Sequence, residues 1–274
     1  MRGVEEMDAK ERIIELFRQN VKGKRPDVSF ANERHDGKAG HWLERQFGIV
    51  ANADNEADLW GFELKNETSS GKTTFGDWSA NEYVFTNPRY AGLFVGRTKS
   101  EKQDSFVRIF GRPNYQKGGR YSWSGSPCPK IGYFNDYGQI LAIQENLDIV
   151  ALYSFSKDKR VDKFSIVPPQ LQQDIIVLAH WYGLARYGIG GKCLQMKLED
   201  KFNDKGWFTC KTDFSGRYDR ICFGAPMNYQ EWIKLVNSGI VYFDSGMYEG
   251  NPRPYSQWRA DNNLWDSLIY EEYY

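Results

Sequence analysis

Residues 57–66 read ADLWGFELKN and place three charged side chains among strand-forming apolar residues. Side chains alternate between the two faces of an extended segment, so Glu63 and Lys65 are expected to point the same way. Gly61 can supply a turn or bulge, which would bring Asp58 alongside them. The stretch therefore predicts two carboxylates and one ammonium group in a small volume.

Such a cluster suits the hydrolysis of phosphodiesters. Two carboxylates held close together repel each other unless a cation lies between them, and oxygen ligands of this kind suit Mg²⁺. An ammonium group beside the metal can hold or activate the attacking water and offset charge on the phosphate. The sequence alone leaves an alternative open, because an arrangement D…ExK with free spacing arises by chance about once in a chain of this length. The same charges could protect an exposed β-edge against aggregation, and Asp54 and Glu56 are nearby rivals to Asp58.

The composition is that of a globular protein without a strong electrostatic field. The 274 residues suffice for one large domain or two modest ones. Lys and Arg number 36 and so do Asp and Glu, so any attraction to DNA must come from a local patch. Aromatic residues are frequent at 16%, which we attribute mainly to core packing and only weakly to base stacking.

The remaining composition excludes several classes of protein. The four cysteines form no CxxC pair, which argues against a structural zinc site and against a disulfide scaffold. The N-terminus lacks an apolar signal-peptide core, and nowhere do about 18 apolar residues run together. We therefore expect a cytoplasmic protein without a membrane segment.

Hydrophobic spacing predicts an α/β or α+β fold, with strands interleaved with a few helices. A C-terminal subdomain is expected to begin near residue 190, at GIGGK, which divides the chain into residues 1–190 and 191–274. The expected helices span residues 8–21, 39–48, 168–188 and 228–239, and the expected strands span residues 59–65, 82–86, 91–96, 105–110, 148–155, 207–211, 220–224 and 239–244.

Upstream of the charged stretch, residues 35–49 read HDGKAGHWLERQFGI. The order G..AG..LE, then about a dozen residues, then D....ELK resembles the active-site region of the MvaI, BcnI and MutH-like group in the PD-(D/E)xK nuclease superfamily. The match covers residues 37–66. The following stretch, SSGKTTFGDWSANEYVF at residues 69–85, resembles restriction enzymes that cut CC-N-GG-type sites.

The resemblance implies a role for each matching residue. Asp58 and Glu63 correspond to metal-binding carboxylates, and Lys65 corresponds to the catalytic lysine. Glu44 corresponds to an additional glutamate near the metal, although it could equally be a structural residue hydrogen-bonded to Lys65. Ala57 stands where the superfamily pattern has proline, so the assignment of Asp58 rests on spacing.

The best candidate for reading bases is FDSGMYEGNPRPYSQWRAD, at residues 243–261. Arg pairs with guanine and Asp accepts from cytosine, and this stretch resembles the C-terminal recognition loop of the MvaI and BcnI enzymes. The alternative is a surface loop held by ion pairs. If the stretch reads bases, its candidate DNA-binding residues are Asp244, Arg253, Tyr255 and Arg259.

Other cations are candidates for contacts with DNA phosphates. Lys38 and His41 precede Glu44, and Lys211 belongs to a basic stretch at residues 205–220. A further basic stretch covers residues 157–163. Charge runs of this kind are more often solvated faces. His180, in an apolar run, is expected to be a satisfied core residue.

Taken together, the resemblance implies a type II restriction enzyme that cleaves double-stranded DNA at a CC-N-GG-like site with one or two Mg²⁺ ions. It implies a restriction-endonuclease-like core with a mixed sheet flanked by helices, and a C-terminal DNA-recognition subdomain. It also implies a bacterial cytoplasmic monomer whose companion methyltransferase protects host DNA without binding the enzyme. The alternatives are a MutH-like strand-nicking repair enzyme and a catalytically inert DNA-binding protein.

Overall fold

The computed structural model describes residues 8–27, 38–50, 55–68, 70–186 and 192–274. The chain forms two compact units, each built from segments that are distant in sequence. The first unit comprises Met1–Thr73, Lys197–Asn228 and Ala260–Tyr274, and the second comprises Thr74–Met196 and Tyr229–Arg259. The division expected at residue 190 lies outside the described residues.

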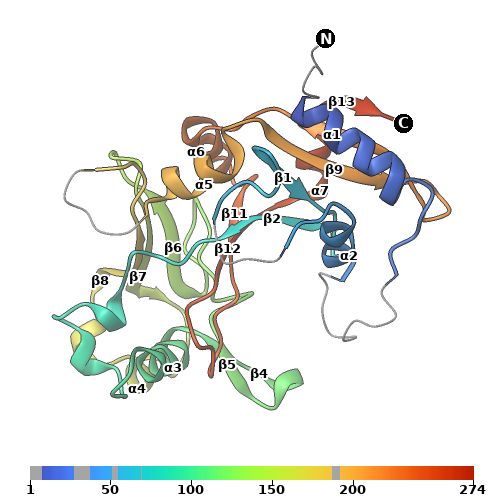
Figure 1. Ribbon diagram of the computed structural model, residues 1–274. Coiled ribbons are helices and arrows are strands. Elements are labelled where there is room, and N and C mark those ends of the chain that lie inside the picture. The colour runs from blue at the N-terminus through green and yellow to red at the C-terminus, as the bar shows by residue number, and fades with distance from the viewer. Residues whose placement is uncertain (1–7, 28–37, 51–54, 69, 187–191) are drawn as a thin grey trace, which may run out of the picture. The chain divides into compact units, whose positions relative to one another are not determined.

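The first unit contains a four-stranded mixed sheet, as the sequence predicted (Figure 1). The strand order is β1-β9-β10-β13, with β1 parallel to β9 and the other neighbours antiparallel. The strands are β1 (Phe62–Lys65), β9 (Gly206–Thr212), β10 (Tyr218–Gly224) and β13 (Ile269–Tyr273).

Helices cover one face of this sheet because their apolar residues recur at helical spacing. These helices are α1 (Ala9–Leu16), its π-helical continuation Phe17–Val21, and α2 (Lys38–Gln46). Phe62 and Leu64 of β1 belong to the core beneath them, so Glu63 and Lys65 point to the opposite face. The other buried members of this core are Ile13, Ile14, Phe17, Val21, Trp42, Leu43, Phe47, Phe208, Cys210, Tyr218, Ile221 and Phe223.

The opposite face of β1 meets aromatic side chains from two further helices. Phe202 ends α5 (Leu194–Phe202), and Trp265 lies in α7 (Asn262–Ser267). Their ring centroids are 6.0 Å apart, and Trp265 makes an edge contact with Trp207 of β9 at 5.0 Å. Glu63 and Lys65 therefore lie in a partly apolar environment.

The second unit contains an antiparallel sheet in the order β3-β8-β7-β6. Its strands are β3 (Glu82–Tyr83), β8 (Asp174–Trp181), β7 (Ile149–Asp158) and β6 (Tyr137–Ile143). A three-stranded sheet has the order β11-β12-β2. Its strands are β11 (Tyr242–Ser245), β12 (Ser256–Asp261) and β2 (Lys72–Asp77).

The described part of the second unit also contains a hairpin, the helices α3, α4 and α6, and short 3-10 turns. The hairpin consists of β4 (Arg112–Asn114) and β5 (Arg120–Ser122). The helices are α3 (Lys99–Phe110), α4 (Lys163–Ile166) and α6 (Tyr229–Asn237). None of the helices within the described ranges is long and apolar enough to cross a membrane.

Aromatic rings account for much of the core of the second unit. Trp181 makes edge contacts with Phe243 at 5.0 Å and with Trp258 at 5.6 Å, while Trp123 contacts Phe106 at 5.0 Å. Trp123, Trp181 and Trp258 are fully buried. The high aromatic content therefore serves packing, as expected. All four cysteines are buried and free of disulfides in the structure.

The helix expected over residues 168–188 is wrong. Pro169–Leu171 forms one 3-10 turn, and the chain then continues as strand β8. A short apolar run fits both a helix and a buried strand, and the β-branched Ile175, Ile176 and Val177 favour the strand. Strand β8 lies between β3 and β7, so both of its edges are paired. His180 lies on this strand rather than on a helix, and it is satisfied by Asp148, with His180 Nε2 2.8 Å from Asp148 Oδ2.

Several expected strands are wrong in whole or in part. Residues 105–110 belong to helix α3, which begins at a reciprocal capping box between Thr98 and Glu101. Residues 91–96 contain a 3-10 turn at Ala91–Leu93. In residues 82–86 only Glu82–Tyr83 is a strand, and a 3-10 turn follows.

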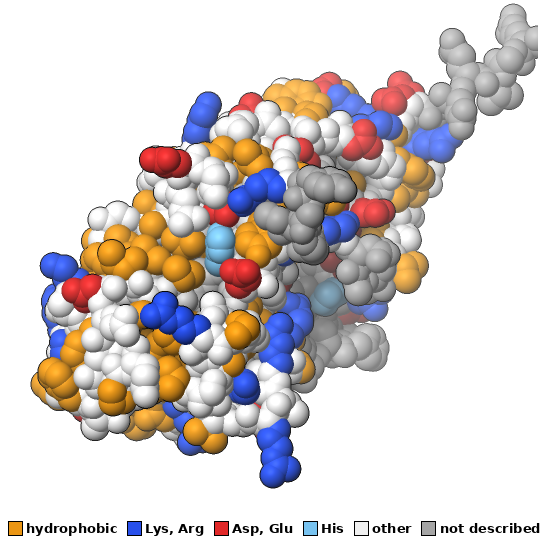
Figure 2. Space-filling model, turned by 90° about the vertical axis from the view of Figure 1, so that its left-hand side faces the viewer, with side chains coloured by type: hydrophobic (Ala, Val, Ile, Leu, Met, Phe, Trp, Pro, Cys, Tyr) orange, Lys and Arg blue, Asp and Glu red, His pale blue; other side chains and the backbone are white. Residues whose placement is uncertain are grey.

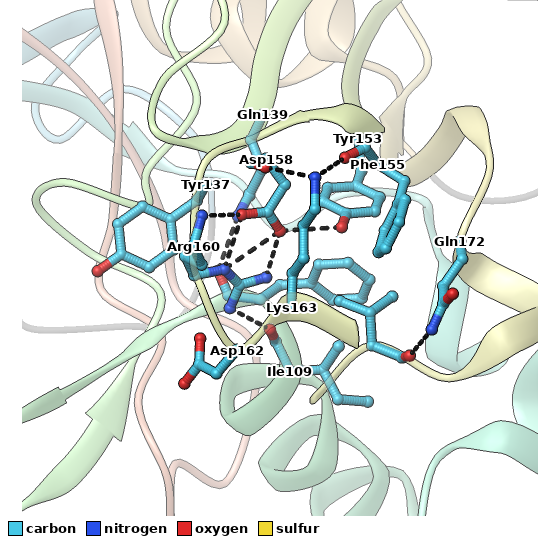
Figure 3. A network of polar contacts seen from close by, with 12 residues as sticks. Ile109, Tyr137, Gln139, Tyr153, Phe155, Asp158, Arg160, Asp162, Lys163 and Gln172 are labelled. Carbon is cyan, nitrogen blue, oxygen red and sulfur yellow. Dashed lines mark hydrogen bonds and ion pairs between the residues drawn. The ribbon is translucent and has the colours of Figure 1, made fainter. Parts of the chain in front are cut away.

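Side chains of the basic stretch at residues 157–163 form hydrogen bonds with the end of β7 and with neighbouring segments (Figure 3). Arg160 Nη2 lies 2.7 Å from Asp158 Oδ2, and Arg160 Nη1 donates to the carbonyl of Ile109 at 2.8 Å. Lys163 Nζ donates to the carbonyl oxygens of Phe155 and Asp158 at 2.8 and 2.7 Å. Arg160 and Lys163 thus satisfy carbonyl and carboxylate groups of the fold itself.

Candidate active site

A two-residue turn folds the chain back immediately before β1. Leu59 and Phe62 exchange backbone hydrogen bonds of 2.9 Å each, and Trp60 and Gly61 between them have φ values of 50° and 90°. Positive φ at both central residues is the signature of a type I′ turn. A Cβ atom on Gly61 would lie 2.1 Å from Asp204 Oδ2, so only glycine fits here. The turn expected at Gly61 is confirmed.

The turn places Asp58 beside β1. Asp58 Oδ2 accepts a hydrogen bond from the backbone N–H of Leu64 at 2.9 Å. The residue keeps an exposed side, but the surrounding protein displaces much of the water around its carboxylate. This desolvation, followed by the charge of Glu63, raises the pKa of Asp58 to about 6. Asp58 and Glu63 are therefore close enough to repel each other.

Glu63 is buried, with 2% of its surface exposed. Its Oε1 accepts hydrogen bonds from Lys65 Nζ at 2.8 Å and from Lys201 Nζ at 2.9 Å. Burial alone would raise the pKa of Glu63, but the two lysines outweigh it and the pKa is lowered. Its Oε2 is also buried and has no hydrogen-bond partner among the described residues. One carboxylate oxygen is thus left without the hydrogen bond that a buried polar atom normally makes.

Lys65 is surrounded by protein. Its ammonium lies 5.0 Å from the ring centroid of Phe202 and 5.9 Å from that of Trp265. Burial lowers the pKa of Lys65, even though the neighbouring Glu63 acts to raise it. The structure thus brings Asp58, Glu63 and Lys65 together, as the sequence predicted.

Glu44 lies on α2, where its Oε2 is 3.0 Å from His41 Nδ1. A Cβ atom on Gly40 would lie 3.8 Å from Asn66 Cβ, so the start of α2 approaches the residue that follows β1. The alternative role of Glu44, a hydrogen bond to Lys65, is not what the structure describes. Lys65 instead donates to Glu63. The role of Glu44 near a metal stays a prediction.

Sequence reasoning missed Lys201. This lysine is 138 residues from Glu63 along the chain and reaches it from helix α5. No local motif surrounds it, and a lysine on an amphipathic helix is usually solvated. Only the packing of α5 against the sheet reveals it. Of the rivals to Asp58, Asp54 lies outside the described residues and Glu56 is exposed.

The candidate base-reading residues lie in the second unit, and several are paired with one another. Arg259 Nη1 on β12 is 3.0 Å from Asp244 Oδ2 on β11. Arg253 Nη2 is 2.8 Å from Asp77 Oδ2, and its guanidinium lies 4.2 Å from the ring centroid of Tyr255. Arg253 is nevertheless half-exposed.

The candidate phosphate-binding residues lie in the first unit. Lys211 of β9 is buried and forms ion pairs with Glu67 and Asp266. His41 is 69% exposed on α2, of which Lys38 is the first residue.

The model of the LlaMI restriction endonuclease family matches residues 21–273. The chain belongs to this family. The chain is 66% identical to the type II restriction enzyme ScrFI of Lactococcus lactis subsp. cremoris, over 95% of this chain and 97% of that protein. It is accordingly a type II restriction enzyme, a sequence-specific DNA endonuclease, as the sequence predicted.

The fold of this LlaMI family enzyme matches that of a solved relative. A complex of restriction endonuclease MvaI with its cognate DNA superimposes with a TM-score of 0.54 at 15% identity, covering 96% of this chain and 95% of that chain. At this identity the likeness concerns the fold alone. The expected restriction-endonuclease-like fold is thereby confirmed.

Proposed function

We propose that this enzyme hydrolyses DNA phosphodiesters at the cluster of Asp58, Glu63 and Lys65, with Mg²⁺ held by the two carboxylates. The observation that carries the proposal is Glu63 Oε2, a buried carboxylate oxygen without a hydrogen-bond partner in the described part of the chain. It stands next to the Asp58 carboxylate, whose pKa is raised first by desolvation and then by the charge of Glu63. A bound cation would satisfy the oxygen and relieve the repulsion.

The donor set fits Mg²⁺ better than it fits a metal with an all-protein cage. Within the described ranges no three Asp, Glu, His or Cys side chains are gathered in metal-binding geometry. Mg²⁺ usually keeps several waters and binds one or two carboxylates together with substrate phosphates. When bound, it would polarise the phosphoryl oxygen and lower the pKa of a coordinated water. The proposal takes one or two such ions.

Lys65 and Lys201 have different tasks in this proposal. Lys65 is buried among aromatic rings, where low polarity strengthens its attraction to the attacking water and to charge developing on the phosphate. Lys201 acts as a positioning residue. Its hydrogen bond to Glu63 Oε1 fixes the carboxylate so that Oε2 stays available to the metal. Glu44 is assigned to the outer part of the metal site.

The proposed target is a short CC-N-GG-like site in double-stranded DNA. Arg253 and Arg259 would donate to guanine, Asp244 would accept from cytosine, and Tyr255 would support Arg253. In this proposal Lys38, His41 and Lys211 contact phosphates, with Lys211 first having to leave its carboxylate partners. The catalytic residues lie in the first unit and the base-reading residues in the second. We assign nuclease chemistry and recognition accordingly, and the division into residues 1–190 and 191–274 stays a prediction.

The cellular setting follows from the restriction function. An enzyme that cuts a short site requires protection of the host's own DNA, so we propose a companion methyltransferase that acts on the same sequence without binding this enzyme. We further propose that the enzyme works as a monomer in the bacterial cytoplasm. Sedimentation of the enzyme with and without a site-containing duplex measures its oligomeric state, and a mass of one chain in both cases is expected.

Plasmid cleavage tests the proposed function. Mixed-sequence plasmid DNA is incubated with the enzyme and Mg²⁺, and the ends of the products are sequenced. Discrete linear fragments that disappear on addition of EDTA and share one CC-N-GG-like sequence at their ends are expected. Fragments with another shared sequence would overturn the proposed site, and nicked circles without linear product would overturn double-strand cutting.

A further inference from the structure

The surface charge of the molecule is mixed. Figure 2 shows Lys and Arg side chains interspersed with Asp and Glu over one face, which agrees with equal numbers of the two kinds. Attraction to DNA therefore has to come from local groups of unpaired cations. One segment departs from the general balance, because residues 105–135 contain five Lys or Arg and no Asp or Glu.

The centre of this segment is the hairpin of β4 and β5, residues 112–122, which we call the basic hairpin. Arg112 pairs with Ser122 and Asn114 with Arg120 across its two strands. At its tip, Gly118 and Gly119 adopt positive φ, and a Cβ atom on either would meet nothing within 4 Å. Residues 115–118 at the tip are exposed.

The side chains of the basic hairpin are exposed or lack a carboxylate partner. Tyr115 is 84% exposed, and Lys117 is exposed and has no ion pair in the described part of the chain. Arg112 is exposed and donates to the Ser126 hydroxyl at 3.2 Å, and no carboxylate partner of it appears among the described residues. Elsewhere in this unit, by contrast, Arg160 and Arg253 are paired with aspartates.

The basic hairpin is attached directly to the proposed recognition stretch, residues 243–261. Glu249 donates its backbone N–H to the carbonyl of Tyr121 at 2.9 Å. The Arg120 guanidinium lies 3.5 Å from the ring centroid of Tyr248, and its buried Nε has no hydrogen-bond partner within the described ranges. Tyr121, Arg120, Tyr248 and Glu249 all lie in the second unit, so the hairpin contacts the recognition stretch within one compact unit.

From this arrangement we propose that the basic hairpin is a DNA-binding arm, which contacts backbone phosphates next to the bases read by residues 243–261. The inference rests on the proposed recognition role of that stretch. Cations on an exposed turn neutralise phosphates without reading sequence, and they fix the register of the neighbouring base-reading residues. Tyr115 at the tip adds a flat exposed ring that can pack against sugar or base edges.

The test measures DNA binding as a function of salt, in EDTA so that the strands stay intact. The variant Arg112→Gln/Lys117→Gln is compared with the wild type and with Lys99→Gln/Lys234→Gln, which removes two exposed cations from α3 and α6. Each lost phosphate contact makes the slope of log K against log salt shallower by about 0.9. We expect a slope shallower by about 1 to 2 for the hairpin variant only, with weaker binding to both site-containing and random duplexes.

Two outcomes separate this proposal from the recognition proposal. If the hairpin variant shows the slope and affinity of the control variant, while the wild type still prefers its site, the arm is overturned and recognition by residues 243–261 stands. If the hairpin variant has the shallower slope but the wild type binds both duplexes equally, the arm stands and base reading is overturned. The substituted side chains are exposed, so thermal unfolding should be unchanged in both variants.

Discussion

Asp58 and Leu64 are joined by a hydrogen bond of 2.9 Å between the Asp58 carboxylate and the Leu64 backbone N–H. This bond links the residue before the turn of residues 59–62 to strand β1. Because Leu64 lies between Glu63 and Lys65, the bond holds Asp58 next to both. The cluster that we propose as the active site is therefore assembled within one short stretch of chain, and the turn positions Asp58 in it.

Replacing Gly61 by alanine tests this dependence on the turn. The new Cβ atom would collide with the Asp204 carboxylate, and the alanine backbone would have to adopt a φ of 90°. We expect a loss of stability of about 2 kcal/mol or more, together with strongly reduced cleavage because Asp58 is displaced. Urea unfolding and single-turnover cleavage provide the measurements.

Gly23→Ala is the matched control for the turn variant. Gly23 has a φ of 75° in the same unit, but a Cβ atom there meets nothing within 4 Å. It should lose only about 1 kcal/mol of stability and keep full cleavage activity. Equal losses in the two variants would contradict the role given to the Gly61 turn.

Lys65 and Lys201 should differ in the kind of defect that their loss produces. Lys65→Met should lower the cleavage rate at saturating Mg²⁺ by about 100-fold or more, because the ammonium acts on the reacting groups. Lys201→Met should chiefly raise the Mg²⁺ concentration needed for half-maximal cleavage, because it orients Glu63. Lys201→Arg should restore much of the Mg²⁺ response.

Mn²⁺ binding followed by electron paramagnetic resonance gives a readout for Lys201 that does not depend on cleavage. Weaker Mn²⁺ binding by Lys201→Met, with partial recovery in Lys201→Arg, is expected. The positioning role fails if Lys201→Met binds Mn²⁺ like the wild type and loses only the maximal rate.

Asp148 should give the second unit a pH-dependent stability. Burial alone would raise its pKa, but the Gly183 N–H and the side chains of Arg186 and His180 outweigh burial, and the pKa of Asp148 is lowered. A lowered pKa means that the contribution is fully present above the unfolded value of about 3.9 and is lost as the pH falls through the folded value. Asp148→Asn should therefore destabilise the protein by about 2 kcal/mol at pH 7.

Urea unfolding of the wild type and Asp148→Asn over a pH series checks this prediction. The difference between the two proteins should shrink at pH values below about 4. A difference that stays constant down to the acid transition would show that the ionised carboxylate is not what stabilises this site. Asp136→Asn is a suitable control, since Asp136 pairs with Lys159 at an exposed position.

The local part of the site could be predicted from the sequence because it is encoded locally. Alternation along β1 fixes the common face of Glu63 and Lys65, and Gly61 marks the turn that returns Asp58. Lys201 could not be predicted, since its contact depends on how a distant helix packs. The partners of Lys211 and Arg253 are likewise fixed only by packing.

Helices and strands could be predicted where the hydrophobic period and the capping residues indicated the same element. Where these signals were ambiguous or far apart, the element could not be predicted. Helix α2 and strands β1, β9 and β10 follow their sequence patterns. Strand β8 does not, because a continuous apolar run satisfies either period, and its β-branched residues together with its place between two strands decide for the strand. The second half of α3 does not follow its pattern either, because its buried Phe106, Val107, Ile109 and Phe110 form a short apolar run typical of a strand, whereas the capping signal lies at Thr98 and Glu101.

The most direct test of the central claim compares cleavage and binding in one Asp58→Asn preparation. The substitution keeps the size of the side chain but removes the charge that would hold Mg²⁺. We expect single-turnover cleavage of a site-containing duplex to fall by at least about 100-fold, while affinity for the same duplex in EDTA stays within about threefold of the wild type. Cleavage at the wild-type rate by Asp58→Asn would contradict the assignment of this cluster as the metal-dependent active site.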